Sequence, residues 1–305
     1  MRQYLFKAIL QMIPVLFLIS LIVFVLVYMT GDPVSLMLSD TATDEDRAIL
    51  IAALGLDQPL HVQYFRYLSN LVQGDFGTSF RYNMPALPIV LERLPATFEL
   101  AIAAMLFATV ISIPLGILSA TKRNSFLDIF VSGTSVLGKA MPPFWLGIML
   151  ILLFSVALKA LPVSGRESWV HLILPAFTLG TGIAAEMTRL IRSSMLEILG
   201  QDYIRTARSK GLIESLIVYK HAFRNSLIPV VTIMALQTST LIGGTLITET
   251  IFSWPGMGQL IIQAVNNRDM AIVQAAVFVV AFLVIFSNML ADILYRVLDP
   301  RIKYN

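Results

Sequence analysis

The sequence predicts an all-α, polytopic membrane protein with six transmembrane helices. Of its 305 residues, 57% are hydrophobic and only 13% are charged, which is about half of the roughly 25% charge found in soluble domains. Six apolar runs are about as long as the roughly 20 residues that cross a bilayer, and they lack the alternating polarity of a transmembrane β-barrel. The predicted spans are residues 8–30, 97–120, 129–158, 171–189, 226–247 and 271–295.

The first apolar run is expected to remain in the protein as a span. It follows Arg2 and Lys7, as the core of a signal peptide would, but it is too long for a typical cleaved segment and no small-x-small cleavage site follows it. The sequence has no cysteine, so neither disulfides nor thiol chemistry contributes.

Basic residues predict the orientation of these spans. One side collects most of the lysines and arginines, and the positive-inside rule assigns that side to the cytoplasm. Both termini belong to it, as an even number of spans requires. Its basic residues are Arg2, Lys7, Lys122, Arg123, Arg192, Arg205, Arg208, Lys210, Lys220, Arg224, Arg296, Arg301 and Lys303.

The segment 31–95 lies on the outer side and is too long to be a simple connector. It contains a helical run at 44–54 that ends at Gly55, a plausible C-cap, and a second amphipathic run at 61–71. We therefore expect a small folded external domain. It is either a stabilising lid or a docking surface for an external partner, and the sequence favours neither.

The most distinctive cytoplasmic segment is 201–211, QDYIRTARSKG, between the fourth and fifth spans. Small and apolar residues recur at spacings of three and four, which predicts one apolar stripe on a short helix. Such a helix can dock in a cleft of a partner protein or lie on anionic headgroups. The small Ala207 would permit close approach, and Gly211 could take a positive φ and reverse the chain. The predicted stripe is Leu196, Leu199, Tyr203, Ala207 and Gly211.

An ordered set of motifs resembles inner-membrane permeases of the dipeptide/oligopeptide/nickel family of binding-protein-dependent ABC importers, which also includes glutathione importers. The similarity covers nearly the whole chain. Two departures are present: residues 205–207 read RTA where the general importer loop reads EAA, as is usual in the peptide branch, and the connection 165–171 is short. The motifs are GDP (31–33), LGLDQPL (54–60), GDFGTS (74–79), LPVSG (161–165), DYIRTARSKG (202–211), HAFRNSLIP (221–229), ETIFSWPGMG (249–258) and DPR (299–301).

The resemblance implies a permease subunit that catalyses no covalent reaction and works by alternating access in the cell inner membrane. It implies a second, homologous permease, two cytoplasmic ATP-binding subunits that hold ATP and Mg²⁺, and an external solute-binding protein. Membrane lipid surrounds the spans, and no nucleic acid is expected. The implied ATPase-coupling residues are Leu199, Asp202, Tyr203, Arg205, Thr206, Ala207, Arg208 and Gly211.

The predicted spans and loops suggest a division of the chain. The first transmembrane helix occupies residues 1–30, the external domain 31–95 and a five-helix permease core 96–295, with the coupling loop at 193–225 and a cytoplasmic tail at 296–305.

Residues 133–139 match the first seven positions of a phosphate-binding P-loop, but Ala140 replaces the Ser or Thr that binds Mg²⁺. No cofactor is therefore expected on this chain.

Polar residues inside the predicted spans are candidates for the solute pathway. Lys139 precedes the helix-breaking Pro142-Pro143. It either contacts a peptide carboxylate or has a structural role, in which it pairs with a carboxylate of the protein or snorkels toward the interface. Glu186 and Arg189 are three residues apart, which favours an ion pair between them. A polar stripe on the fifth span either lines the pathway or lets helices pack closely; its residues are Gln237, Thr240, Gly244 and Thr248.

Two rival classes remain at this point. An ion-coupled secondary transporter would need several ionisable groups near the midplane and often shows internal repeats, but mainly Lys139 lies there and no repeat is clear. A membrane sensor or scaffold would leave the segment 201–211 without an ATPase partner.

Overall fold

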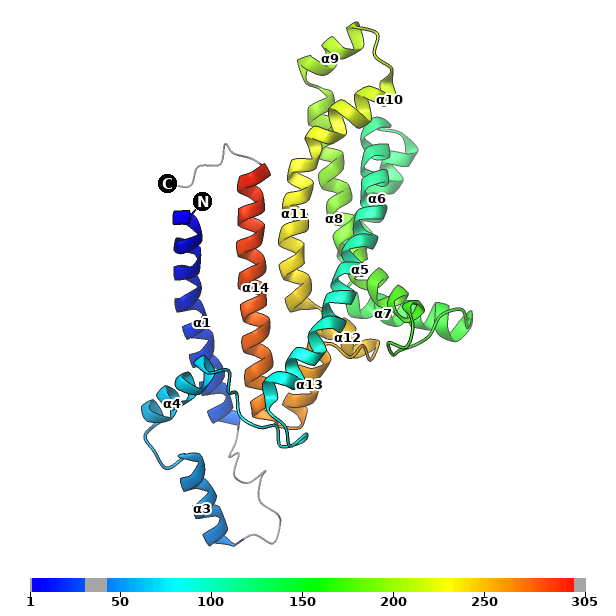
Figure 1. Ribbon diagram of the computed structural model, residues 1–305. Helices are drawn as coiled ribbons and strands as arrows, with labels where there is room; N and C mark the ends of the chain where they lie inside the picture. Colours follow the sequence, from blue (N-terminus) through cyan, green and yellow to red (C-terminus); the bar gives the residue numbers. More distant parts are fainter. Residues whose placement is uncertain (1, 31–42, 299–305) are drawn as a thin grey trace. The chain divides into compact units, whose positions relative to one another are not determined.

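The computed structural model describes residues 2–30 and 43–298. These residues are predominantly helical and form two compact units, Met1–Pro95 with Gly256–Ile285 and Ala96–Pro255 with Phe286–Asn305 (Figure 1). Two long helices, α5 (Ala86–Thr121) and α14 (Met270–Leu298), contribute to both units. The motifs at 31–33 and 299–301 lie outside the described residues.

In the first unit, helix α4 (Leu60–Val72) packs on helix α1 (Arg2–Thr30). The Tyr64 hydroxyl lies 2.9 Å from the hydroxyl of Ser20. Helix α3 (Asp44–Leu54) starts at a capping box in which Thr43 and Asp46 exchange hydrogen bonds, and it ends at Gly55. The two helical runs predicted for the external segment are thus confirmed. The core of this unit joins the start of α5, helix α13 (Met257–Asn266) and the start of α14.

The second unit is arranged around helix α8 (Ile173–Leu199), against which α6, α7 and α11 pack (Figure 1). Alanine and methionine side chains of α8 are buried in the largest apolar cluster. The remaining elements are α6 (Phe126–Ala140), α7 (Pro143–Leu150), the π-helical turn η1 (Ile151–Ala157), the 3₁₀ turn η2 (Trp169–Leu172), α9 (Asp202–Ser209), α10 (Glu214–Leu216), the π-helical turn η3 (Ile217–Phe223), α11 (Arg224–Gly244) and α12 (Leu246–Ile251).

Three straight helices are long and apolar enough to span a membrane: Ala86–Thr121, Trp169–Leu199 and Met270–Leu294. Two bent helix pairs raise the number to as many as five, and α1 adds a shorter apolar helix at Leu10–Leu26. The chain is therefore a polytopic helical membrane protein.

The predicted span at 129–158 is not one straight helix. It divides into Phe126–Ala140 and Pro143–Ala157, which meet at 104°. The break expected at Pro142-Pro143 is thereby confirmed, because a proline inside a helix removes a hydrogen bond and clashes with the preceding turn. Residues 133–139, which resemble a P-loop in sequence, lie inside helix α6 and form no loop.

Helices α5 and α8 approach closely at Gly180. A Cβ atom there would lie 2.6 Å from Phe107 and 2.8 Å from the backbone oxygen of Ala104. Only glycine fits this contact, because the backbone of α5 cannot move aside as a flexible side chain could.

We expect Gly180→Ala to destabilise the protein by about 1–3 kcal/mol, the usual cost of overpacking. Gly182→Ala, two residues further along the same helix, is the matched control, because a Cβ atom there would meet nothing within 4 Å. The midpoint of thermal unfolding, followed by tryptophan fluorescence in detergent, distinguishes them. Equal midpoints would contradict the close α5–α8 contact.

Candidate functional site

The segment 201–211 forms a separate short helix, α9, after a break in the chain. Helix α8 ends at Leu199, Gln201 is extended, and α9 begins at Asp202, whose carboxylate lies in its first turn. A negative side chain at this position is favourable because it complements the helix dipole. Gly211 has φ 77° and reverses the chain toward α10, as the sequence predicted (Figure 1).

The apolar side of α9 faces this chain's own core. Ile204 is fully buried and Ala207 is 9% exposed, and both belong to the cluster that contains Ile217, Val218 and Ala222. Ile204 is the residue that the sequence interpretation missed, although its spacing of three from Ala207 is a helical signal. Ala207 is consequently not available for close approach to a partner.

The predicted stripe from Leu196 to Gly211 is corrected by this geometry. It assumed one continuous helix, whereas the break between Leu199 and Asp202 resets the helical phase. Tyr203 is therefore half-exposed, and its hydroxyl accepts a 3.0 Å hydrogen bond from Nδ2 of Asn225 at the start of α11.

The other side of α9 is polar and exposed. Arg205 is 75% exposed and lies 3.5 Å from Asp202, a pair too solvated to contribute much stability. Arg208 binds both carboxylate oxygens of Glu214, at 3.1 and 2.6 Å, and this hydrogen bonding raises the pKa of Arg208 above its ordinary value. Thr206 donates back to the carbonyl of Asp202. The helix thus presents charge outward while its apolar side is fixed.

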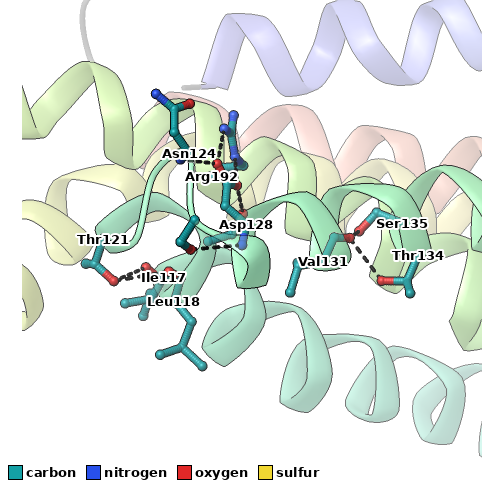
Figure 2. Close-up of polar contacts among 11 residues, drawn as sticks. Ile117, Leu118, Thr121, Asn124, Asp128, Val131, Thr134, Ser135 and Arg192 are labelled. Carbon is teal, nitrogen blue, oxygen red and sulfur yellow. Dashed lines mark hydrogen bonds and ion pairs between the residues drawn. The ribbon is translucent and has the colours of Figure 1, made fainter.

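A second polar cluster joins the α5–α6 turn to helix α8 (Figure 2). The guanidinium of Arg192 binds both oxygens of buried Asp128, with its Nε 2.6 Å from Oδ1 and its second nitrogen 2.8 Å from Oδ2. The Ser119 hydroxyl and the backbone N–H of Asn124 donate to the same carboxylate. Arg192 lies on α8 ahead of α9, so this clamp holds the end of α8 that carries α9.

A third cluster joins three helices through two of the predicted pathway residues. Lys139 of α6 lies 2.6 Å from Oε2 of Glu186 on α8, and Nε2 of Gln237 on α11 donates to the same oxygen at 3.2 Å. Glu186 therefore pairs with Lys139 and not, among the described contacts, with Arg189. The local spacing that favoured Arg189 is outweighed by the packing of α6 on α8.

The polar stripe predicted on the fifth span is not continuous. Thr240 is exposed and Gly244 is the last residue of α11, but Thr248 lies on α12 and is fully buried. The carboxylate of Glu249 accepts hydrogen bonds from Thr97 and Thr245, at 2.8 and 2.9 Å, which hold α12 against α5. Thr248 is thus buried in the protein, whereas Thr240 is exposed.

The apolar spans and the anchored helix α9 define a polytopic helical membrane subunit. The sequence profile of the binding-protein-dependent transport system inner membrane component matches residues 112–304, and its N-terminal counterpart matches residues 1–101. The chain belongs to this family. It is a permease subunit of an ABC importer and not an enzyme, which excludes the secondary transporter and the sensor.

Its relatives match along their whole length. The oligopeptide transport system permease protein AppB of Bacillus subtilis (strain 168) is 42% identical over the whole of both chains. The dipeptide transport system permease protein DppB of Escherichia coli (strain K12) is 42% identical over all of this chain and 99% of its own. The glutathione transport system permease protein GsiC of Salmonella paratyphi A (strain ATCC 9150 / SARB42) is 41% identical over the whole of both.

A solved structure shares the fold. An inward-facing form of the MetNI methionine ABC transporter superposes with a TM-score of 0.57 over 69% of this chain and 96% of that one, at 20% sequence identity. This likeness concerns the fold, whereas the family profiles and the full-length relatives confirm the family resemblance of the motifs.

We expect Gly211→Ala to strain the reversal after α9 by about 1–2 kcal/mol, because an L side chain is disfavoured at positive φ. Gly211→Asn should cost less, because asparagine tolerates this conformation, and neither side chain would clash, since no atom lies within 4 Å. Limited proteolysis of the 205–215 segment measures the effect. Equal cleavage rates for wild type and Gly211→Ala would contradict it.

Asp128→Asn should destabilise the protein by roughly 1–3 kcal/mol, because Arg192 loses its charged partner. The double variant Asp128→Asn/Arg192→Gln should regain part of the loss, since no uncompensated charge remains. Thermal unfolding of the three proteins provides the measurement. A double variant less stable than Asp128→Asn would show that the ion pair is not the source of the effect.

Proposed function

We propose that this chain translocates peptides or peptide-like solutes into the cytoplasm as one of two permeases in an ATP-driven importer. The proposed solute is a dipeptide, an oligopeptide, glutathione or a metal complex. The proposal is supported by full-length relatives that are named for oligopeptide, dipeptide and glutathione transport. A solute-binding protein delivers the ligand from outside, and two ATPase subunits bind ATP and Mg²⁺ in the cytoplasm.

The proposed topology has six spans and two cytoplasmic termini. It assigns α9 to the cytoplasm, and it assigns α3 and α4 to an external domain within residues 31–95 that contacts the solute-binding protein. The placement of basic residues supports it. Lys139, Gln237 and Thr240 are proposed to line the pathway, because three helices bring the first two together at Glu186.

The observation that carries the mechanism is the division of α9 into a buried and an exposed side. Ile204 and Ala207 fix the helix to the permease core, so a force applied to α9 is passed to the spans instead of being absorbed by a flexible loop. The exposed residues Asp202, Tyr203 and Arg205 are proposed to contact the ATPase. Thr206, Arg208 and the turn at Gly211 shape the loop around them.

A substitution at Ala207 does not test this contact, because a charged side chain there would disrupt the packing of α9. Arg205→Glu is the appropriate test. We expect it to reduce ATP-driven uptake of a radiolabelled dipeptide into proteoliposomes about tenfold, since reversed charge at an interface is strongly unfavourable. Co-purification of the ATPase should fall in parallel.

Lys159→Glu is the matched control, because Lys159 is an exposed cation of the same unit on the side proposed to be external. Its uptake should equal that of wild type. Unchanged uptake in Arg205→Glu would refute the coupling role of α9, and a wild-type complex that takes up no peptide would refute the substrate class.

A further inference from the structure

The ion pair between Lys139 and Glu186 lies where charge is least expected. Glu186 lies inside the 31-residue apolar helix Trp169–Leu199, within the span predicted at 171–189. Yet the side chains of Lys139 and Glu186 are 50% and 28% exposed. A charged group inside a membrane span usually faces a water-filled cavity or a partner, because exposure to lipid is costly.

Open space adjoins the pair. Gly182 lies one turn before Glu186 on helix α8, and a Cβ atom at this glycine would meet nothing within 4 Å. On the other side, α6 and α8 are in close contact, since a Cβ atom at Gly138 would lie 3.3 Å from Thr181 and 3.5 Å from Ala185. The two charges therefore lie on closely packed helices, one turn from a position of α8 that no other part of the described chain covers.

The partners of this ion pair can be exchanged easily, but neither charge can remain unpaired. A partly exposed ion pair contributes only about 0–1 kcal/mol, so exchanging its partners for the charged groups of a ligand costs little. Each separated charge then needs a new partner, because an isolated charge inside the membrane is unfavourable. A solute with a single charge satisfies one of them, whereas a solute with both charges satisfies Lys139 and Glu186 together.

We infer that Lys139, Glu186 and Gln237 form a subsite for zwitterions, a class that includes peptides with free termini. The carboxylate of the solute binds the ammonium group of Lys139, and the ammonium group of the solute binds the carboxylate of Glu186. The side-chain amide of Gln237 donates a hydrogen bond within the same subsite. The inference rests on the proposed function and specifies which chemical feature of a peptide the permease recognises. Net charge at the site is zero before and after binding.

The test measures binding without the solute-binding protein. The permease, purified with its partner subunits in nanodiscs, is titrated with alanyl-alanine, N-acetyl-alanyl-alanine and alanyl-alaninamide, and saturation-transfer NMR detects each ligand. Wild type should bind the free dipeptide about tenfold more tightly than either blocked form, the contribution of one charge-assisted hydrogen bond.

The single variants should shift this preference in opposite directions. Lys139→Met leaves the Glu186 carboxylate and should favour the cationic alanyl-alaninamide, while Glu186→Gln leaves the Lys139 ammonium and should favour the anionic acetylated form. An ion pair that only stabilises the fold would not produce opposite preferences. The matched control removes the Arg166–Glu99 pair, also 2.6 Å long with both side chains 40% exposed, through Arg166→Met/Glu99→Gln, and should leave the wild-type order unchanged.

Equal binding of the three peptides, no binding of any, or the same preference in both single variants would overturn the subsite. These outcomes leave the proposed function intact, because ATP-driven uptake with the solute-binding protein is measured separately. A complex that shows the expected preferences but no uptake would instead refute the importer mechanism.

Discussion

The close packing of α8 is the constraint on which the rest of the second unit depends. Helix α8 contacts α5, α6, α7 and α11, and Gly180 and Gly138 allow two of these approaches. The same helix carries Glu186, Arg192 and the connection to α9. In a membrane, polar groups must find partners inside the protein because lipid provides none. A small displacement of α8 would therefore separate both of its ion pairs at once.

The two ion pairs of α8 differ in how firmly their partners are held. Near its end, Arg192 and buried Asp128 form a bidentate pair supported by Ser119 and the Asn124 backbone, an arrangement with little freedom to rearrange (Figure 2). Near its midpoint, Glu186 has one cation and one amide as partners and remains partly exposed. The first arrangement suits transmission of movement, and the second suits exchange of partners.

Local chemistry made part of this architecture predictable. Gly55, Gly211 and Pro142-Pro143 act through their own backbone preferences, so a turn, a reversal and a helix break followed from the sequence. The pairs Lys139–Glu186 and Asp128–Arg192 did not, because their members are 47 and 64 residues apart and meet only through the packing of α6 on α8. Ile204 was missed because the break after Leu199 changes which residues of the next helix share a face.

The separation of the two sides of α9 has a consequence for how related importers diverge. The buried residues Ile204 and Ala207 anchor α9 to the rest of the permease. The exposed residues Asp202 and Arg205 form only a solvated ion pair that contributes little to the stability of the fold. Substitutions at Asp202 and Arg205 can therefore change the charge on the exposed side of α9 without unfolding the subunit. On the proposed contact between α9 and the ATPase, differences in this exposed charge pattern would let several such transporters in one membrane each bind their own ATPase subunits.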